Sequence, residues 1–253
     1  INYLYIQKAA NEVRQKILNK DDIIHFTDLI DFFIDLHAVI IPVLWGKKDS
    51  HENSLHIYLP ESMTTWVFLN LDANLMDFKF WMAHELGHVK TPDFEDCEKE
   101  MFAEQFAGAL LFPEDLAKNV YNELSCRNKE SDQINHILNI AEQLYISPIT
   151  ILTQINAYAN YINEPIIDIN IYPATTLFNK EYKLVSEILF GTKKPLPEHY
   201  IRISQEEFKT PFFKCLKEYL DNNDKNHNFI QRVMNIPISD SKGIFQVLVN
   251  GTN

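Results

Sequence analysis

The most informative segment of this chain is Asn74-Leu-Met-Asp-Phe-Lys-Phe-Trp-Met-Ala-His-Glu-Leu-Gly-His88. Asn74 is a candidate N-cap, and Asp77 follows three residues later, as in the start of many helices. The apolar side chains of the stretch supply faces for packing against a core, and they are Phe78, Trp81, Met82 and Leu86. The pattern predicts one buried helix over residues 74–88, which Thr91 and Pro92 end.

His84 and His88 are four residues apart, slightly more than one helical turn, so their imidazoles project from one face and can share a metal ion. Glu85 lies between them and can reach a water molecule bound to that metal. Two histidine ligands and a carboxylate that can act as a base are the residues that a zinc hydrolase needs. The alternative is chance, because a bare H-E-x-x-H pattern occurs in many unrelated proteins. Gly87 is costly in a helix and is tolerable if another element passes close to the metal.

Zinc hydrolases use three protein ligands and leave a fourth position for water, so a third ligand is expected downstream. Metzincins have glycine three residues after the second histidine and a further ligand three residues beyond it. This chain has Thr91 and Phe94 at those positions, which excludes that class. The acidic residues that follow the helix are expected to be solvated loop charges, and they are Asp93, Glu95, Asp96 and Glu98.

Glu100 opens a second helical pattern, in which positions 100, 103, 104 and 107 share a face and carry Glu, Ala, Glu and Ala. Small residues allow a second helix to approach closely. Two carboxylates on such a face are costly unless a cation or an imidazole pairs with them. We therefore assign Glu100 to the metal and Glu104 to a hydrogen bond with the other nitrogen of a ligand imidazole. The alternative is a solvated acidic edge.

Two motifs of the chain together resemble those of the ImmA/IrrE metallopeptidase family. They are Phe80-Trp-Met-Ala-His-Glu-Leu-Gly-His88 and Glu100-x-x-Ala103-Glu104-x-Phe106-Ala107-x-x-Leu110-Leu111-Phe112-Pro113. The resemblance covers about residues 1–160 and includes Trp66-Val-Phe-Leu-Asn70, which is similar to a family strand that ends in Asn.

The resemblance implies that His84, His88 and Glu100 hold Zn²⁺ and that Glu85 is the catalytic residue. The chain departs from the family at Glu104, where the family has Asn or Asp. The side chain of Glu104 is longer, which changes its reach to the ligand imidazole, but its carboxylate can still accept a hydrogen bond.

Composition agrees with a folded intracellular enzyme. The chain has 253 residues, and 46% of them are apolar, which is enough for a large core in one or two domains. Its three cysteines are widely spaced and odd in number, so they predict a reducing compartment, the cytoplasm, rather than a disulfide framework. The sequence has no apolar run of 18 residues and no signal-peptide pattern near its start, so no membrane association is expected.

The net charge of −12 argues against a general nucleic-acid surface, because phosphate binding needs clustered Lys and Arg. We therefore expect a protein partner and no direct nucleic-acid binding. The sequence does not indicate the oligomeric state.

The predicted fold class is α+β, a mainly helical zincin-like domain with a small sheet, followed by a smaller α/β accessory domain. Three apolar runs separated by polar turns predict the sheet just before the metal-binding helix, and they are 38–45, 54–59 and 65–71. Helices are predicted at 3–18, 27–37 with Thr27 as N-cap, 94–112, 114–124, 132–144, 148–161, 180–190 and 205–220. Residues 166–172 alternate like a strand, and His56 is expected on the polar side of its strand.

These patterns predict a metallopeptidase domain over residues 1–163 and an accessory domain of unknown role over 164–253. The resemblance implies a regulatory zinc endopeptidase that cleaves a specific cytoplasmic protein, such as a helix-turn-helix repressor or an antitoxin. The alternative is a regulatory binding module in which the metal site is structural or idle.

Overall fold

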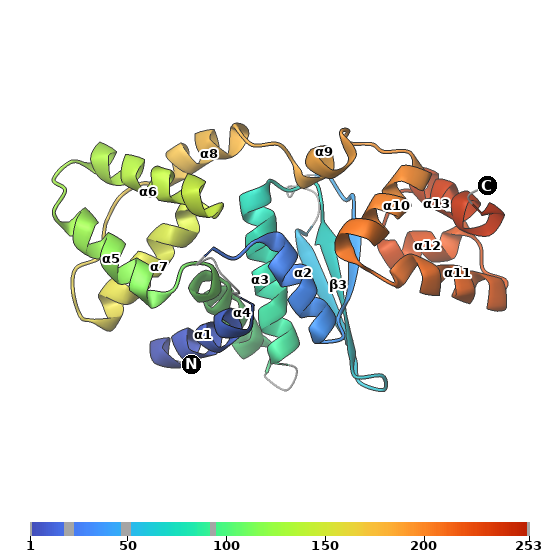
Figure 1. Ribbon diagram of the computed structural model, residues 1–253, viewed down its shortest axis with the longest axis horizontal. Coiled ribbons are helices and arrows are strands. Elements are labelled where there is room, and N and C mark those ends of the chain that lie inside the picture. Colours follow the sequence, from blue (N-terminus) through green and yellow to red (C-terminus); the bar gives the residue numbers. More distant parts are fainter. Residues whose placement is uncertain (1, 18–22, 47–51, 92–94, 252–253) are drawn as a thin grey trace. The chain divides into compact units, whose positions relative to one another are not determined.

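The computed structural model describes residues 2–17, 23–46, 52–91 and 95–251, which form a mainly helical α+β fold with a small mixed sheet (Figure 1). The described chain divides into two compact units. Unit 1 contains residues 1–29 and 75–182, and unit 2 contains residues 30–74 and 183–253. The fold class predicted for the N-terminal part of the sequence is therefore confirmed.

Unit 1 is helical. Its helices are α1 (Tyr3–Ile17), α3 (Leu75–Lys90), α4 (Asp96–Leu111), α5 (Glu114–Ser125), α6 (Glu130–Leu144), α7 (Pro148–Tyr161) and α8 (Tyr172–Lys180). Helix α4 packs against both α1 and α3, and α7 packs against α4, α5, α6 and α8. The rings of Phe102 and Phe106 stack with centroids 5.4 Å apart and are fully buried, so α4 supplies much of the core of this unit.

Unit 2 is built on a three-stranded sheet of order β1-β3-β2, from β1 (Val39–Val43), β2 (Ser54–Leu59) and β3 (Thr64–Asn70). Strand β3 pairs in parallel with β1, Val39 opposite Trp66, and antiparallel with β2, Ser54 opposite Leu69. The central strand is mostly buried, whereas residues alternate on the edge strand β2, as expected for a strand with one covered face. All three predicted strands are confirmed.

The helices of unit 2 are α9 (Val185–Phe190), α10 (Pro197–Phe208), α11 (Phe212–Asn222), α12 (His227–Met234) and α13 (Ile238–Asn250). Helix α2 (Phe26–Asp35) spans the boundary between the units. The edge strand β1 has Pro42, which lacks an N–H donor and is tolerated at sheet edges. The carbonyls of Ile40 and Pro42 accept hydrogen bonds from the hydroxyls of Thr210 and Tyr200, so α10 and the turn after it protect this edge.

Several predicted helices match closely, and three details are wrong. Helix α2 begins at Phe26, so Thr27 lies inside it and is not its N-cap. The predicted helix over 205–220 is two helices, because Pro211 cannot continue α10 and Lys209 adopts a left-handed conformation with φ 48°. The predicted helix over 180–190 is also interrupted, since the amides of Val185 and Ser186 bond to the carbonyls of Ala73 and Leu71 at 2.9 and 2.8 Å.

The strand predicted at 166–172 is wrong, and with it the α/β character of the accessory domain. Residues 164–251, all of which the structure describes, contain helices α8 to α13 and no strand. The backbone of Ile167 finds its partners in one side chain, because its N–H donates to Asn156 Oδ1 at 2.8 Å and its carbonyl accepts from Asn156 Nδ2 at 3.1 Å. An alternating segment becomes a strand only beside another strand.

The predicted boundary after residue 163 stays a prediction, since the compact units group residues by their packing in three dimensions. Within the described residues, no helix combines the length and the apolarity that crossing a bilayer requires.

Candidate metal centre

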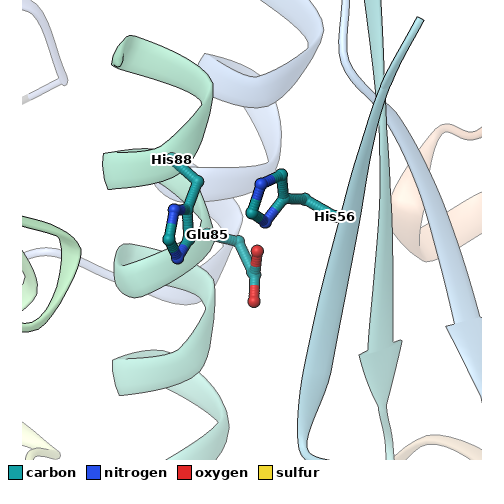
Figure 2. Close-up of side chains that lie close together, drawn as sticks. All are labelled: His56, Glu85 and His88. Carbon is teal, nitrogen blue, oxygen red and sulfur yellow. The ribbon is translucent and has the colours of Figure 1, made fainter. Parts of the chain in front are cut away.

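Helix α3 carries the two histidines on one buried face. His84 is 5% exposed and His88 4% exposed, and their rings meet edge to face with centroids 4.8 Å apart. Glu85, on the same helix, is 3% exposed. Figure 2 shows the side chains of Glu85 and His88 projecting from α3. The helix predicted around the H-E-x-x-H pattern is therefore confirmed, and the three side chains are held on a rigid element.

Gly87 explains how α4 comes close enough to complete the site. A Cβ atom at this position would lie 2.8 Å from the Cα of Ala103 and 3.1 Å from its Cβ. Only glycine on α3 and a small residue on α4 permit this approach of two helix backbones. The close approach expected from Gly87 is confirmed, and it brings the first turns of α4 beside the histidines.

Glu100 of α4 lies against both imidazoles. Its Oε2 is 3.5 Å from His84 Nε2, its Oε1 is 3.3 Å from His88 Nε2, and the two Nε2 atoms are 3.1 Å apart. Tetrahedral zinc with bonds of about 2.0–2.1 Å holds neighbouring ligand atoms about 3.3–3.4 Å apart. The two nitrogen atoms and the carboxylate thus have roughly the spacing of ligands around one ion, so these residues fit zinc.

The alternative reading of this triangle is a hydrogen bond between the two imidazoles. A single such bond would satisfy one donor and one acceptor and would leave the carboxylate of Glu100 without a role. The convergence of two nitrogen atoms and one carboxylate on a common point favours a metal, because this donor set is typical of catalytic zinc sites. The ligand assignment of His84, His88 and Glu100 stays a prediction.

Glu104 lies one turn after Glu100, and its Oε2 is 3.9 Å from His84 Nδ1. This distance is compatible with an ion pair but exceeds the range of a hydrogen bond. His84 Nδ1 is buried and has no hydrogen-bond partner among the described residues. The side chain of Glu104 is 65% exposed, so a rotation could bring it to that nitrogen. Its predicted contact with the imidazole stays a prediction.

Aromatic rings enclose the other side of His84. The ring of Trp81 meets it edge to face with centroids 5.3 Å apart, and the ring of Phe80 lies 6.4 Å away. Such packing limits the orientations that the imidazole can adopt.

Figure 2 shows the side chain of His56 projecting from β2. This residue lies opposite Val67 of β3 and is partly buried, so it does not lie on a fully exposed surface.

Sequence reasoning missed Lys79, a charged residue that α3 buries. It is 3% exposed, and its Nζ donates to the carbonyl of Leu144 at 2.8 Å, at the C-terminal end of α6. Burial, and then the charge of Arg14, lower the pKa of Lys79 from 10.5 to about 7. The available signal was its position between Phe78 and Phe80 in an otherwise apolar turn.

Residues 36–152 match the family model of peptidase M78, the IrrE N-terminal-like domain. This region contains the three strands, the histidine pair and the whole of α4. No curated protein matches the chain.

Proposed function

Since this chain belongs, through residues 36–152, to the peptidase M78 family of metallopeptidases, we infer that it is a zinc-dependent endopeptidase. The single observation that carries this inference is the cluster of His84 Nε2, His88 Nε2 and the Glu100 carboxylate, in which the two nitrogen atoms are 3.1 Å apart and each has one carboxylate oxygen 3.3 to 3.5 Å away. In this proposal His84, His88 and Glu100 hold the ion, and the carboxylate of Glu104 steadies the imidazole of His84.

Zinc, when bound, acts as a Lewis acid that activates water and polarises the peptide carbonyl. The chain contributes a base, Glu85, whose position next to His84 in sequence and whose burial keep it beside the ligand face. Its carboxylate accepts the proton of the attacking water and returns that proton to the leaving amine. Rigid helices hold these groups, so little reorganisation is needed during the reaction.

The partner in this proposal is a specific protein that is cleaved in the cytoplasm, such as a helix-turn-helix repressor or an antitoxin. The acidic net charge of −12 supports a protein substrate over nucleic acid. The three cysteines are exposed and form no disulfide, which supports a reducing compartment.

The test compares the wild type with Glu85→Gln, because Gln keeps the shape of the side chain and cannot accept the proton. Each variant is expressed with the proteins encoded beside its gene, and new N-termini are identified by mass spectrometry. Glu85→Gln should bind one equivalent of zinc, remain folded and lose cleavage by orders of magnitude. Glu98→Gln, an exposed change on α4, is the matched control and should cleave normally.

Equal cleavage by the wild type and Glu85→Gln would contradict the role of Glu85. If the wild type produces no new terminus and Glu85→Gln retains full cellular function, the protein is a binding module rather than a peptidase.

A further inference from the structure

Unit 2 contains a cavity of about 620 Å³ that is separate from the candidate metal ligands. Its lining includes Trp45 and Gly46, just after β1, and Asp72, just after β3. Because β1 and β3 are parallel, their carboxyl ends meet at one edge of the sheet, where open α/β sheets bind ligands. The volume lies within the range of small-molecule sites.

The floor of the cavity is apolar because its aromatic residues use their polar atoms elsewhere. Trp45 Nε1 donates to the carbonyl of Met234 at 2.8 Å, and the hydroxyl of Tyr200 donates to the carbonyl of Pro42. Burial raises the pKa of Tyr200, so its ring stays neutral. Ile236 and Ile244, both buried, complete the floor. The part of the cavity formed by these four residues therefore favours an apolar ligand body.

The floor is also well supported. Gly46 N–H donates to Asp72 Oδ2 at 2.8 Å, Gly46 O accepts from Asn70 Nδ2 at 2.9 Å, and the ring of Trp45 stacks on Phe68 with centroids 6.1 Å apart. These bonds fix the turn after β1 without any ligand. The cavity is therefore part of the folded unit and needs no rearrangement to form.

The exposed rim of the cavity carries two lysines, and neither of them is held in a buried ion pair within the part of the chain that the structure describes. Lys194 forms no ion pair with any residue in the described ranges, and Lys193 lies 3.7 Å from Glu187 in an exposed pair that contributes little. Two carboxylates, Asp72 and Asp240, also line the cavity and keep their negative charge, but neither forms an ion pair with Lys193 or Lys194 among the described residues. Asp72 accepts from Gly46 and from the hydroxyl of Ser186 at 2.8 Å each, and Asp240 accepts from Ser239 at 3.0 Å.

Two helices also begin at the cavity. Pro197 is the first residue of α10, and Pro237 is the N-cap of α13; neither helix has a side-chain hydrogen bond at its N-cap. Each helix has one acidic residue in its first turn, Glu198 in α10 and Asp240 in α13, which offsets part of the positive end of its dipole, so the two lysines supply most of the positive charge at the cavity.

We propose that this cavity binds a small organic anion, with its carboxylate or phosphate at Lys193 and Lys194 and an apolar ring-containing body on Trp45 and Tyr200. The lysines alone would accept any anion, but a free inorganic anion would leave the apolar floor in contact with water. The apolar floor alone would accept a neutral hydrocarbon, but such a ligand would leave the lysines without a counter-charge. The combination requires one molecule with both features.

The test uses full-length protein labelled with 5-fluorotryptophan and fluorine NMR. Of the three tryptophans, Trp45 alone contributes to the lining, and its resonance is assigned with Trp66→Phe and Trp81→Phe. The probes are 2-naphthoate, 2-naphthyl phosphate, neutral 2-naphthylmethanol and acetate. One or both naphthyl anions should shift the Trp45 resonance saturably, at least about tenfold more tightly than the neutral alcohol or acetate. The tighter of the two identifies the preferred acid group.

Lys194→Glu should weaken binding of the naphthyl anions by at least about tenfold and leave the neutral probe unchanged. The matched control is Lys214→Glu, an exposed lysine of α11 in the same unit that does not line the cavity. Ile244→Phe places a larger side chain in the floor of the cavity and should weaken the binding of all naphthyl probes. Circular dichroism checks that this variant is folded. The proposal is overturned if neither anion shifts Trp45 at millimolar concentration, if charge makes no difference, or if both lysine variants behave alike.

Discussion

Glu100 is the most exposed of the three candidate ligands, with 67% of its side chain accessible, whereas both histidines are almost fully buried. As an ion pair, such a carboxylate would contribute little to stability, because water screens it. As a metal ligand it would matter far more, since two imidazoles without a third donor form a weak zinc site. Because Glu100 is exposed, its loss should matter little if the cluster is an ion pair and should matter strongly if the cluster binds zinc.

Replacement of Glu100 distinguishes these two interpretations. Glu100→Ala should lower zinc affinity by more than about 100-fold, beyond the loss typical of residues that only support a ligand, while the free energy of unfolding without metal stays nearly unchanged. Zinc affinity is measured by competition with a chelator. Glu98→Ala, at an exposed position of the same helix, is the control and should bind zinc normally. Stoichiometric, tight zinc in Glu100→Ala would remove this residue from the site.

Lys79 makes stability depend on pH. The unfolded chain holds this proton up to about pH 10.5, whereas the native state releases it near 7. Between these values the unfolded state binds more protons, so the free energy of unfolding rises with pH. Relative to Lys79→Met, the wild type should gain roughly 2 kcal/mol between about pH 7 and pH 9.

Urea unfolding of both proteins at the two pH values measures this difference, and it cancels the contributions of groups that both share. The control is Lys99→Met, on α4, whose side chain is only partly buried, and it should show the wild-type dependence. If wild type and Lys79→Met change in parallel, the buried lysine keeps an ordinary pKa.

At the scale of elements, the contact between α3 and α4 depends on Gly87. Alanine is the better helix former by about 1 kcal/mol, but its Cβ would meet the backbone of Ala103, which cannot rotate away. Gly87→Ala should therefore destabilise the fold by about 1–3 kcal/mol and weaken zinc binding, because α4 carries Glu100.

Thermal unfolding and chelator competition measure both effects. The control is Gly108→Ala on α4, where the added Cβ would meet the end of the Gln154 side chain, which can move more readily than a backbone. Gly108→Ala should leave zinc affinity closer to that of the wild type. A stabilised Gly87→Ala variant with normal zinc affinity would mean that the two helices are free to separate.

At the scale of the whole molecule, the three candidate ligands all belong to unit 1, on α3 and α4. Zinc that binds only the native state should stabilise it by about 2.7 kcal/mol when its free concentration is 100 times the dissociation constant. Removal of zinc with a chelator should lower the thermal midpoint and increase hydrogen exchange in α3 and α4, with little change in α10 to α13. Equal changes in both sets of helices would show that metal binding is not confined to unit 1.

Elements whose patterns are local could be predicted from the amino-acid sequence. Residues 75–88 lie in one helix because the apolar periodicity and the end signals lie within one stretch, and four-residue spacing places both histidines on one face. The three strands could also be predicted, because polar turns separate apolar runs of strand length. Pro211 was an available signal for the break between α10 and α11, and the prediction overlooked it.

Features that depend on partners far away in the sequence became visible once the chain was folded. Residues 166–171 alternate as strand residues do, yet Asn156 satisfies the backbone of Ile167 and no neighbouring strand exists among the described residues. The break before α9 arises because the amides of residues 185 and 186 bond to carbonyls of the segment just after β3, more than 100 residues earlier in the chain. The cavity beside Trp45 likewise joins segments from the two ends of the sequence. Periodicity reports which face of an element is apolar, whereas hydrogen bonds between distant segments determine where that element stops and what it encloses.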